Sequence, residues 1–144
     1  MTPTDLRLQR TIAAAPEEVF RAWTSPEVLE RWWSAGPSWT PAECDVDARP
    51  GGRYRLRMRN RESGAVSEVG GEYREVEPPH RLVYTWRWAG DEHTSLVTVE
   101  FVGEGDRTTT VVVEHTALAS EDSRAAHAAG WEGVLDTLAG EVLP

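Results

Sequence analysis

The residues best suited to bind a ligand are aromatic side chains on three segments that alternate apolar and polar residues. Alternation over 53–59, 66–76 and 81–88 predicts β-strands with one apolar face each. On that face, aromatic rings surround one glycine, Gly71. The rings belong to Tyr54, Tyr84, Trp86 and Trp88. An inward glycine leaves a hole in the sheet wall, which favours a pocket for an apolar ligand. The alternative is a filled core, in which Trp131 or another ring occupies the space.

Pairing the predicted strands about their turns arranges the inward residues in rows, because directly opposed residues of an antiparallel pair share a face. The central row is expected to contain Tyr54, Gly71, Trp86, Ser95 and His115. The rows on either side are expected to contain Leu56, Val69, Trp88 and His93, and Tyr73, Tyr84, Val97 and Val113. A register error of two residues would change the rows but not the face. The candidate ligand-binding residues are Tyr54, Gly71, Tyr73, Tyr84, Trp86, Trp88, His115, His127, Trp131 and Trp33.

Histidines on the same apolar surfaces have two interpretations. His127 lies four residues before Trp131 on the apolar stripe of the predicted last helix. It is either a hydrogen-bonded core residue or a ligand contact at one end of the cavity. His115 and His93 share the inward parity, and three inward histidines suggest zinc, which favours imidazole. Their spacings match no metal motif and no carboxylate clearly joins them, so neither a metal nor a cofactor is expected.

Arginine recurs at every second residue of segment 53–59, an arrangement that could bind an anion. Neighbouring strands place acidic residues on the same outer face, namely Glu43, Asp45, Asp47, Glu68 and Glu72. We therefore expect an ion-paired, solvated surface, with phosphate or RNA binding as the alternative. Arg10 has the parity of Leu8 and Ile12, and we expect it to pair with a nearby glutamate rather than with a ligand carboxylate.

Trp32 and Trp33 end a short predicted helix near the pocket mouth. One ring is expected in the core, and the other as a gate or as a contact for a partner protein. Cys44 has apolar neighbours in parity and is expected to be a buried small hydrophobe. The sequence contains no GxSxG, GxGxxG, phosphate-loop or HExxH motif, so it indicates neither a standard nucleophile nor a nucleotide site.

The elements that must position these residues follow an order typical of an α+β protein. A strand over 6–12 precedes two short helices that begin at Pro16 and Pro26, because proline fits the first helical turn. Six more strands are predicted, over 42–48, 53–59, 66–76, 81–88, 93–102 and 108–115. Ser120 then caps a long helix. Its apolar stripe comprises His127, Trp131, Leu135, Leu138 and Val142. The strands meander, so we expect an antiparallel sheet with the last helix packed on its apolar face.

Six segments carry a resemblance to a known family. They are residues 15–24, 29–33, 49–54, 70–73, 75–86 and 127–131, of which 75–86 (EVEPPHRLVYTW) is the most distinctive. The sequence resembles the START/SRPBCC (birch-pollen-allergen-like) superfamily. Within it, the sequence is similar to the activator of heat-shock protein 90 ATPase homologue, C-terminal-domain-like family. This resemblance implies a helix-grip fold, in which a curved antiparallel sheet wraps around the C-terminal helix. It also implies a cavity between them that often holds an apolar or aromatic small molecule.

Length and charge narrow the class of protein. The 144 residues suit a single domain over 1–144. The net charge of −9 argues against binding to nucleic acid and against attraction to anionic membranes. No apolar run is long enough to span a bilayer. The sequence opens with no signal peptide and its single cysteine allows no internal disulfide, so a cytoplasmic location is expected.

Three functions remain open. The first is a non-catalytic binding protein for a small hydrophobic or aromatic molecule. The second is an enzyme, since the resemblance extends to cyclases and aromatases, and a hydrolase or hydratase is also open. In such an enzyme, His127 or His115 would act as acid or base, with Tyr54 or Tyr84 as its partner. The third is a chaperone-associated or stress-response module. A chaperone partner is not expected, because the resemblance places chaperone binding in a second domain. A homodimer is left open.

Overall fold

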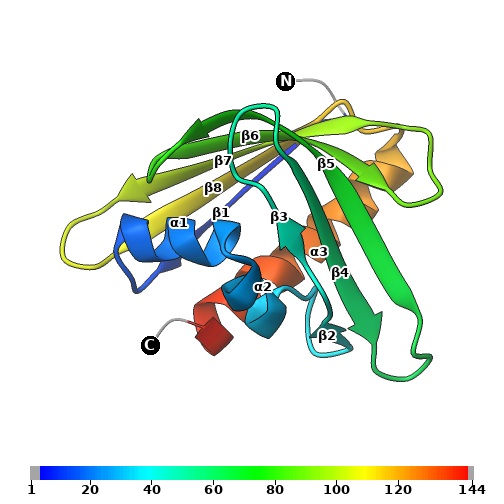
Figure 1. The fold of residues 1–144 in the computed structure, drawn as a ribbon, viewed down its shortest axis with the longest axis horizontal. Coiled ribbons are helices and arrows are strands. Elements are labelled where there is room, and N and C mark those ends of the chain that lie inside the picture. The colour runs from blue at the N-terminus through cyan, green and yellow to red at the C-terminus, as the bar shows by residue number, and fades with distance from the viewer. Residues whose placement is uncertain (1–3, 143–144) are drawn as a thin grey trace.

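An eight-stranded antiparallel sheet curves around the C-terminal helix in the computed structural model, which describes residues 4–142 (Figure 1). The strands are β1 (Leu6–Ile12), β2 (Trp39–Pro41), β3 (Asp45–Val46), β4 (Arg53–Asn60), β5 (Val66–Glu77), β6 (Arg81–Trp88), β7 (Ser95–Gly103) and β8 (Thr109–Thr116). The helices are α1 (Pro16–Thr24), α2 (Pro26–Trp32) and α3 (Glu121–Thr137), and a π-helical turn, η1 (Leu138–Val142), extends α3. The strand order is β1-β8-β7-β6-β5-β4-β2, with β3 also paired to β4. The predicted α+β helix-grip fold is therefore confirmed.

The strand registers follow the predicted rows in most of the sheet. Tyr54 opposes Gly71, and Tyr84 opposes both Tyr73 and Val97. Between β7 and β8 the register differs by two residues from the prediction, because His115 opposes Val97 instead of Ser95. The face is unchanged by this shift, and the His115 side chain is buried.

Within the segment predicted as one strand over 42–48, only Asp45–Val46 (β3) is a strand, and a second short strand, β2, lies just before that segment. β2 and β3 each pair with β4, and the ladder is interrupted between them. At the interruption, the backbone N–H of Cys44 donates to Glu30 Oε2 at 3.0 Å instead of to a strand carbonyl. A side chain of α2 therefore replaces a strand partner at this point. Cys44 is buried as predicted, and burial raises the pKa of its thiol.

α1 and α2 begin at Pro16 and Pro26, as predicted, and cover one end of the sheet (Figure 1). Phe20 of α1 packs edge-on against Phe101 of β7, with ring centroids 5.3 Å apart. The α2 helix brings both Trp32 and the following Trp33 into the core. The expectation that one of these rings lies at a gate or a partner surface is wrong, because both are buried.

α3 runs along the concave face of the sheet (Figure 1). Ser120 caps it by accepting the Ser123 N–H at 3.1 Å. The expected stripe is confirmed, since Trp131, Leu135 and Leu138 are buried and His127 is half-buried; the Val142 side chain lies outside the described part. Gly133 fixes the helix close to the loop after α2, because a Cβ there would lie 2.6 Å from the carbonyl carbon of Ala35.

Candidate ligand cavity

One half of the inner sheet face is a solid core of tyrosine rings. The rings of Tyr54, Tyr73 and Tyr84 contact one another, with centroids 5.0 to 5.7 Å apart. Tyr54 donates its hydroxyl proton to the carbonyl of Thr85 at 2.6 Å, and Tyr84 Oη accepts the indole N–H of Trp23 at 3.2 Å. Burial raises the pKa of all three phenols, so they remain neutral at physiological pH. For this half, the filled-core alternative holds, and these tyrosines do not line the cavity described below.

Gly71 does not leave the hole that the sequence suggested. A Cβ at this position would lie 2.5 Å from Thr85 Oγ1 and closer still to the Thr85 carbonyl oxygen. The same threonine hydroxyl accepts the N–H of Glu72 at 2.9 Å. Gly71 is therefore required because β5 and β6 approach too closely for a side chain. The prediction of a pocket centred over Gly71 is wrong.

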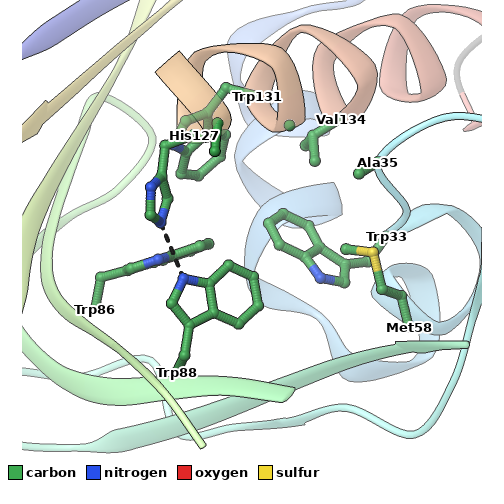
Figure 2. A pocket seen from close by; sticks show the side chains of 10 residues that line it. Trp33, Ala35, Met58, Trp86, Trp88, His127, Trp131 and Val134 are labelled. Atoms are coloured by element: carbon green, nitrogen blue, oxygen red, sulfur yellow. Dashed lines mark hydrogen bonds between the residues drawn. The ribbon is translucent and has the colours of Figure 1, made fainter. Parts of the chain in front are cut away.

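A cavity of ≈ 260 Å³ lies in the other half, between β6, α3 and the segment after α2 (Figure 2). Its described lining residues are Trp33, Ala35, Met58, Trp86, Trp88, Ala126, His127, Gly130, Trp131 and Val134. Trp33, Trp86, Trp88, His127 and Trp131 were candidate site residues from the sequence, and the structure brings them together. Trp86 contacts both Trp33 and Trp88, with ring centroids 6.3 and 5.4 Å apart. The cavity is therefore lined almost entirely by indole rings and small apolar groups.

Two small residues of α3 leave room for this cavity. Ala126 and Gly130 lie one helical turn apart on the face toward β6, and both line the cavity. A Cβ at Gly130 would meet no atom within 4 Å. Sequence reasoning missed these residues, although a glycine and an alanine four residues apart beside His127 and Trp131 were a usable signal. Met58, Ala35 and Val134 were also missed.

His127 connects α3 to β6 beside the cavity (Figure 2). The indole N–H of Trp88 donates to His127 Nε2 at 2.9 Å. An indole nitrogen only donates, so Nε2 is unprotonated and the proton of the neutral ring is on Nδ1. This Nδ1 lies 2.7 Å from the Ser123 carbonyl, to which it donates. Both ring nitrogens are thus hydrogen-bonded within the chain. Of the two interpretations of His127, the structure therefore supports the hydrogen-bonded core residue.

His115 lies behind the cavity wall and does not line it. Its Nδ1 accepts the indole N–H of Trp131 at 3.0 Å, so its proton is on Nε2, which lies 2.7 Å from Ser95 Oγ. Ser95 in turn donates to the Trp86 carbonyl at 3.3 Å. Burial, with a smaller effect from nearby His127, lowers the pKa of His115 to about 3. His115 is therefore a neutral residue that holds two of the cavity tryptophans, and it is not the predicted ligand contact.

Two cavity tryptophans have unpaired indole nitrogens. Neither Trp33 nor Trp86 has an acceptor for its N–H within the described chain, although both side chains are buried. Four other indoles have acceptors: Trp23, Trp32, Trp88 and Trp131. A buried donor without an acceptor is destabilising. These two N–H groups are therefore unsatisfied donors on side chains that line the cavity, although the nitrogens themselves have almost no exposed surface.

The remaining predicted features lie outside the cavity. Arg55 and Arg57 point outward and pair with Asp45 at 2.8 Å and Glu68 at 2.7 Å, as the ion-paired surface predicts. Arg10 is exposed and pairs with Asp136 rather than a glutamate.

His93 is exposed instead of inward, and its Nε2 lies 2.6 Å from the Ala117 carbonyl. Among the described residues, no three histidine, cysteine, aspartate or glutamate side chains gather as a metal site would require. No helix in the described range has the length and apolar composition to cross a membrane.

A curved antiparallel sheet closed around a C-terminal helix, with a cavity between them, defines the helix-grip class of proteins. The family model "Activator of Hsp90 ATPase homolog 1-like protein" matches residues 13–142, and the chain belongs to this family. The human and mouse proteins named "Activator of 90 kDa heat shock protein ATPase homolog 1" are 23% and 22% identical to it over 129 residues, which is 88% of this chain. The chain spans only 33% of the length of each of these relatives.

Solved structures agree with this assignment. A protein from Chromobacterium violaceum superposes with a TM-score of 0.84 at 27% identity, covering 97% of this chain and 98% of that one. The AHSA1 protein from Silicibacter pomeroyi superposes with a TM-score of 0.81 at 29% identity, covering 94% of both chains. An Hsp90 activator from Plasmodium falciparum, at 24% identity and a TM-score of 0.66 over 88% of this chain and 86% of that one, shares the fold.

Proposed function

We propose that this protein binds a small apolar or aromatic molecule in the cavity between β6 and α3. The observation that carries the proposal is a space of ≈ 260 Å³ with four tryptophans in its lining. That volume lies close to the lower end of the range for small-molecule sites, about 300 Å³. Apolar lining with few polar groups is typical of such sites.

The packing around the cavity supports binding rather than a defect of the core. Gly130 places no side chain in the space, although alanine would be more favourable in a helix. Hydrogen bonds from Trp88 to His127 and from Trp131 to His115 hold two of the indoles in place without a ligand. The Trp88 and Trp131 rings are therefore fixed before a ligand binds, which lowers the cost of binding.

The acid–base pair of the enzyme alternative is not assembled. Tyr54 and Tyr84 lie in the filled half, and the nitrogens of His115 and His127 are occupied by partners within the chain. Binding without catalysis is therefore the function that this geometry supports best.

The test is to fill the cavity from Gly130. The neutral two-ring fluorescent probe Prodan is titrated into the parent protein and into Gly130→Leu, and its emission is followed. We expect the leucine to occupy the space and weaken probe binding by at least about tenfold. Gly130→Ala controls for the helix backbone, and Ala129→Leu adds the same side chain at an exposed neighbouring position. A folded Gly130→Leu protein that binds the probe as tightly as the parent contradicts the proposal.

A second candidate function comes from the names of the human and mouse relatives, which are activators of a heat-shock ATPase. In this function, the surface of the protein would increase the rate of ATP hydrolysis by a chaperone of the Hsp90 class. The measurement is that ATPase rate with and without the full chain. Gly130→Leu separates the two functions, because it fills the cavity and should leave surface-based stimulation intact.

A further inference from the structure

Two unpaired indole N–H groups lie on side chains that line the cavity, and they restrict the class of ligand. We propose that the ligand is a neutral, planar molecule of one or two fused rings that carries a carbonyl oxygen. That oxygen accepts a hydrogen bond from the indole N–H of Trp33 or Trp86. This inference rests on the proposed function, because it names the class of molecule that the same cavity takes.

The cavity lining offers no opposite charge to an ionic ligand. Of the ten described residues that line the cavity, His127 is the single titratable one, and both of its nitrogens are already hydrogen-bonded. A carboxylate or ammonium group that entered the cavity would lose its hydration without gaining an opposite charge. Indole faces do attract cations, so a cationic probe is included in the test below.

The unpaired hydrogen-bonding groups next to the cavity are donors on Trp33 and Trp86. The N–H groups of Trp33 and Trp86 have no acceptor among residues 4–142, whereas those of Trp88 and Trp131 are satisfied by histidine nitrogens. An acceptor oxygen on the ligand would satisfy one of the free donors, while a ligand hydroxyl or amine would find no free acceptor on the indoles. A carbonyl group without a donor therefore matches this lining better than a phenol does.

The two free N–H groups are covered by neighbouring rings in the empty cavity. Both nitrogens have almost no exposed surface. The Trp33 ring contacts Trp86 and Trp131, with centroids 6.3 and 6.0 Å apart (Figure 2). A ligand carbonyl reaches these donors when one of the lining rings turns, so binding should be visible at the indole N–H itself.

The volume limits the size of the ligand. At ≈ 260 Å³, the cavity lies near the lower end of the range for small-molecule sites, about 300 Å³. That volume favours a ligand of one or two fused rings over a larger one.

The experiment compares coumarin, a two-ring molecule with a carbonyl acceptor and no donor, with naphthalene, which has neither. Binding is followed by tryptophan fluorescence and by ¹H–¹⁵N spectra of the indole N–H groups, assigned with Trp33→Phe and Trp86→Phe. We expect coumarin to move the N–H resonance of Trp33 or Trp86 downfield. We also expect one of these variants to weaken coumarin binding by about fivefold and naphthalene binding by less than about twofold. Trp39→Phe, outside the cavity, is the matched control and should change neither affinity.

Each outcome separates the inference from the proposed function. If both probes bind, lose affinity equally in the variants and leave both N–H resonances in place, the ligand class is overturned and the cavity remains a binding site. Binding of 2-naphthylmethylammonium or 2-naphthoate as tightly as coumarin overturns neutrality. If coumarin, naphthalene and Prodan all fail to bind, the proposed function fails as well.

Discussion

The indole N–H of Trp131 on α3 donates to Nδ1 of His115 on β8 at 3.0 Å, across the interface between helix and sheet. Because tryptophan can only donate, this bond fixes the tautomer of His115 and directs its other nitrogen to Ser95. The bond also holds the Trp131 ring, which contacts Trp86 at a centroid distance of 5.1 Å. A buried, neutral histidine thus sets the position of two cavity tryptophans without contacting the cavity.

The first prediction concerns the pH dependence of stability. In the folded protein the pKa of His115 is lowered from 6.5 to about 3, so the unfolded chain takes up this proton first as the pH falls. The contribution of neutral His115 to the free energy of unfolding is complete above about pH 6.5. It is lost at about 1.4 kcal/mol per pH unit between about pH 6.5 and pH 3. Urea unfolding of the parent and of His115→Gln at several pH values measures it. Parallel curves for the two proteins would contradict the assignment.

The second prediction concerns Trp131, which is 2% exposed and contacts the rings of Trp23, Trp33 and Trp86. Trp131→Ala should lower the free energy of unfolding by about 3–5 kcal/mol, because it removes a large buried ring. Denaturant unfolding measures this change. Val102→Ala, at an exposed apolar residue of β7, should change stability by less than about 0.5 kcal/mol and is the control. A negligible shift for Trp131→Ala would show that α3 does not pack as described.

The third prediction contrasts two glycines. At Gly71, a Cβ would collide with the backbone of Thr85, so Gly71→Ala should destabilise the protein by at least about 1–3 kcal/mol. At Gly130 the space is free and the backbone is helical, so Gly130→Ala should stabilise it by about 0.5–1 kcal/mol. Thermal unfolding of both variants gives the signs. Equal effects of the two substitutions would contradict the difference in packing.

The fourth prediction concerns the outer surface. Arg55 pairs with Asp45 in an exposed position, so Arg55→Ala should cost less than about 1 kcal/mol. It should also leave binding of a neutral probe unchanged, because the ion pair lies on the opposite face of the sheet from the cavity. Unfolding and probe titration on the same preparation measure both quantities. A large loss of probe affinity would place this surface at the functional site.

The sequence predicts the faces of strands and helices here better than it predicts empty space. Alternation is local, so Tyr54, Trp86 and Trp88 were assigned to the inner face without knowledge of the fold. Which part of that face is filled depends on the approach of β5 to β6 and on the directions of ring side chains, which have no local signature. For this reason alternation predicts a hole at Gly71, where the two strands approach closely, and gives no sign of the space at Gly130.

The bonds from Trp88 to His127 and from Trp131 to His115 have a consequence for binding kinetics. Two of the four indoles are already immobilised in the empty protein, so little side-chain entropy is lost at those positions on association. Compounds that fit the cavity should then associate at similar rates, set by diffusion and orientation. Differences in affinity among them should appear chiefly as differences in residence time.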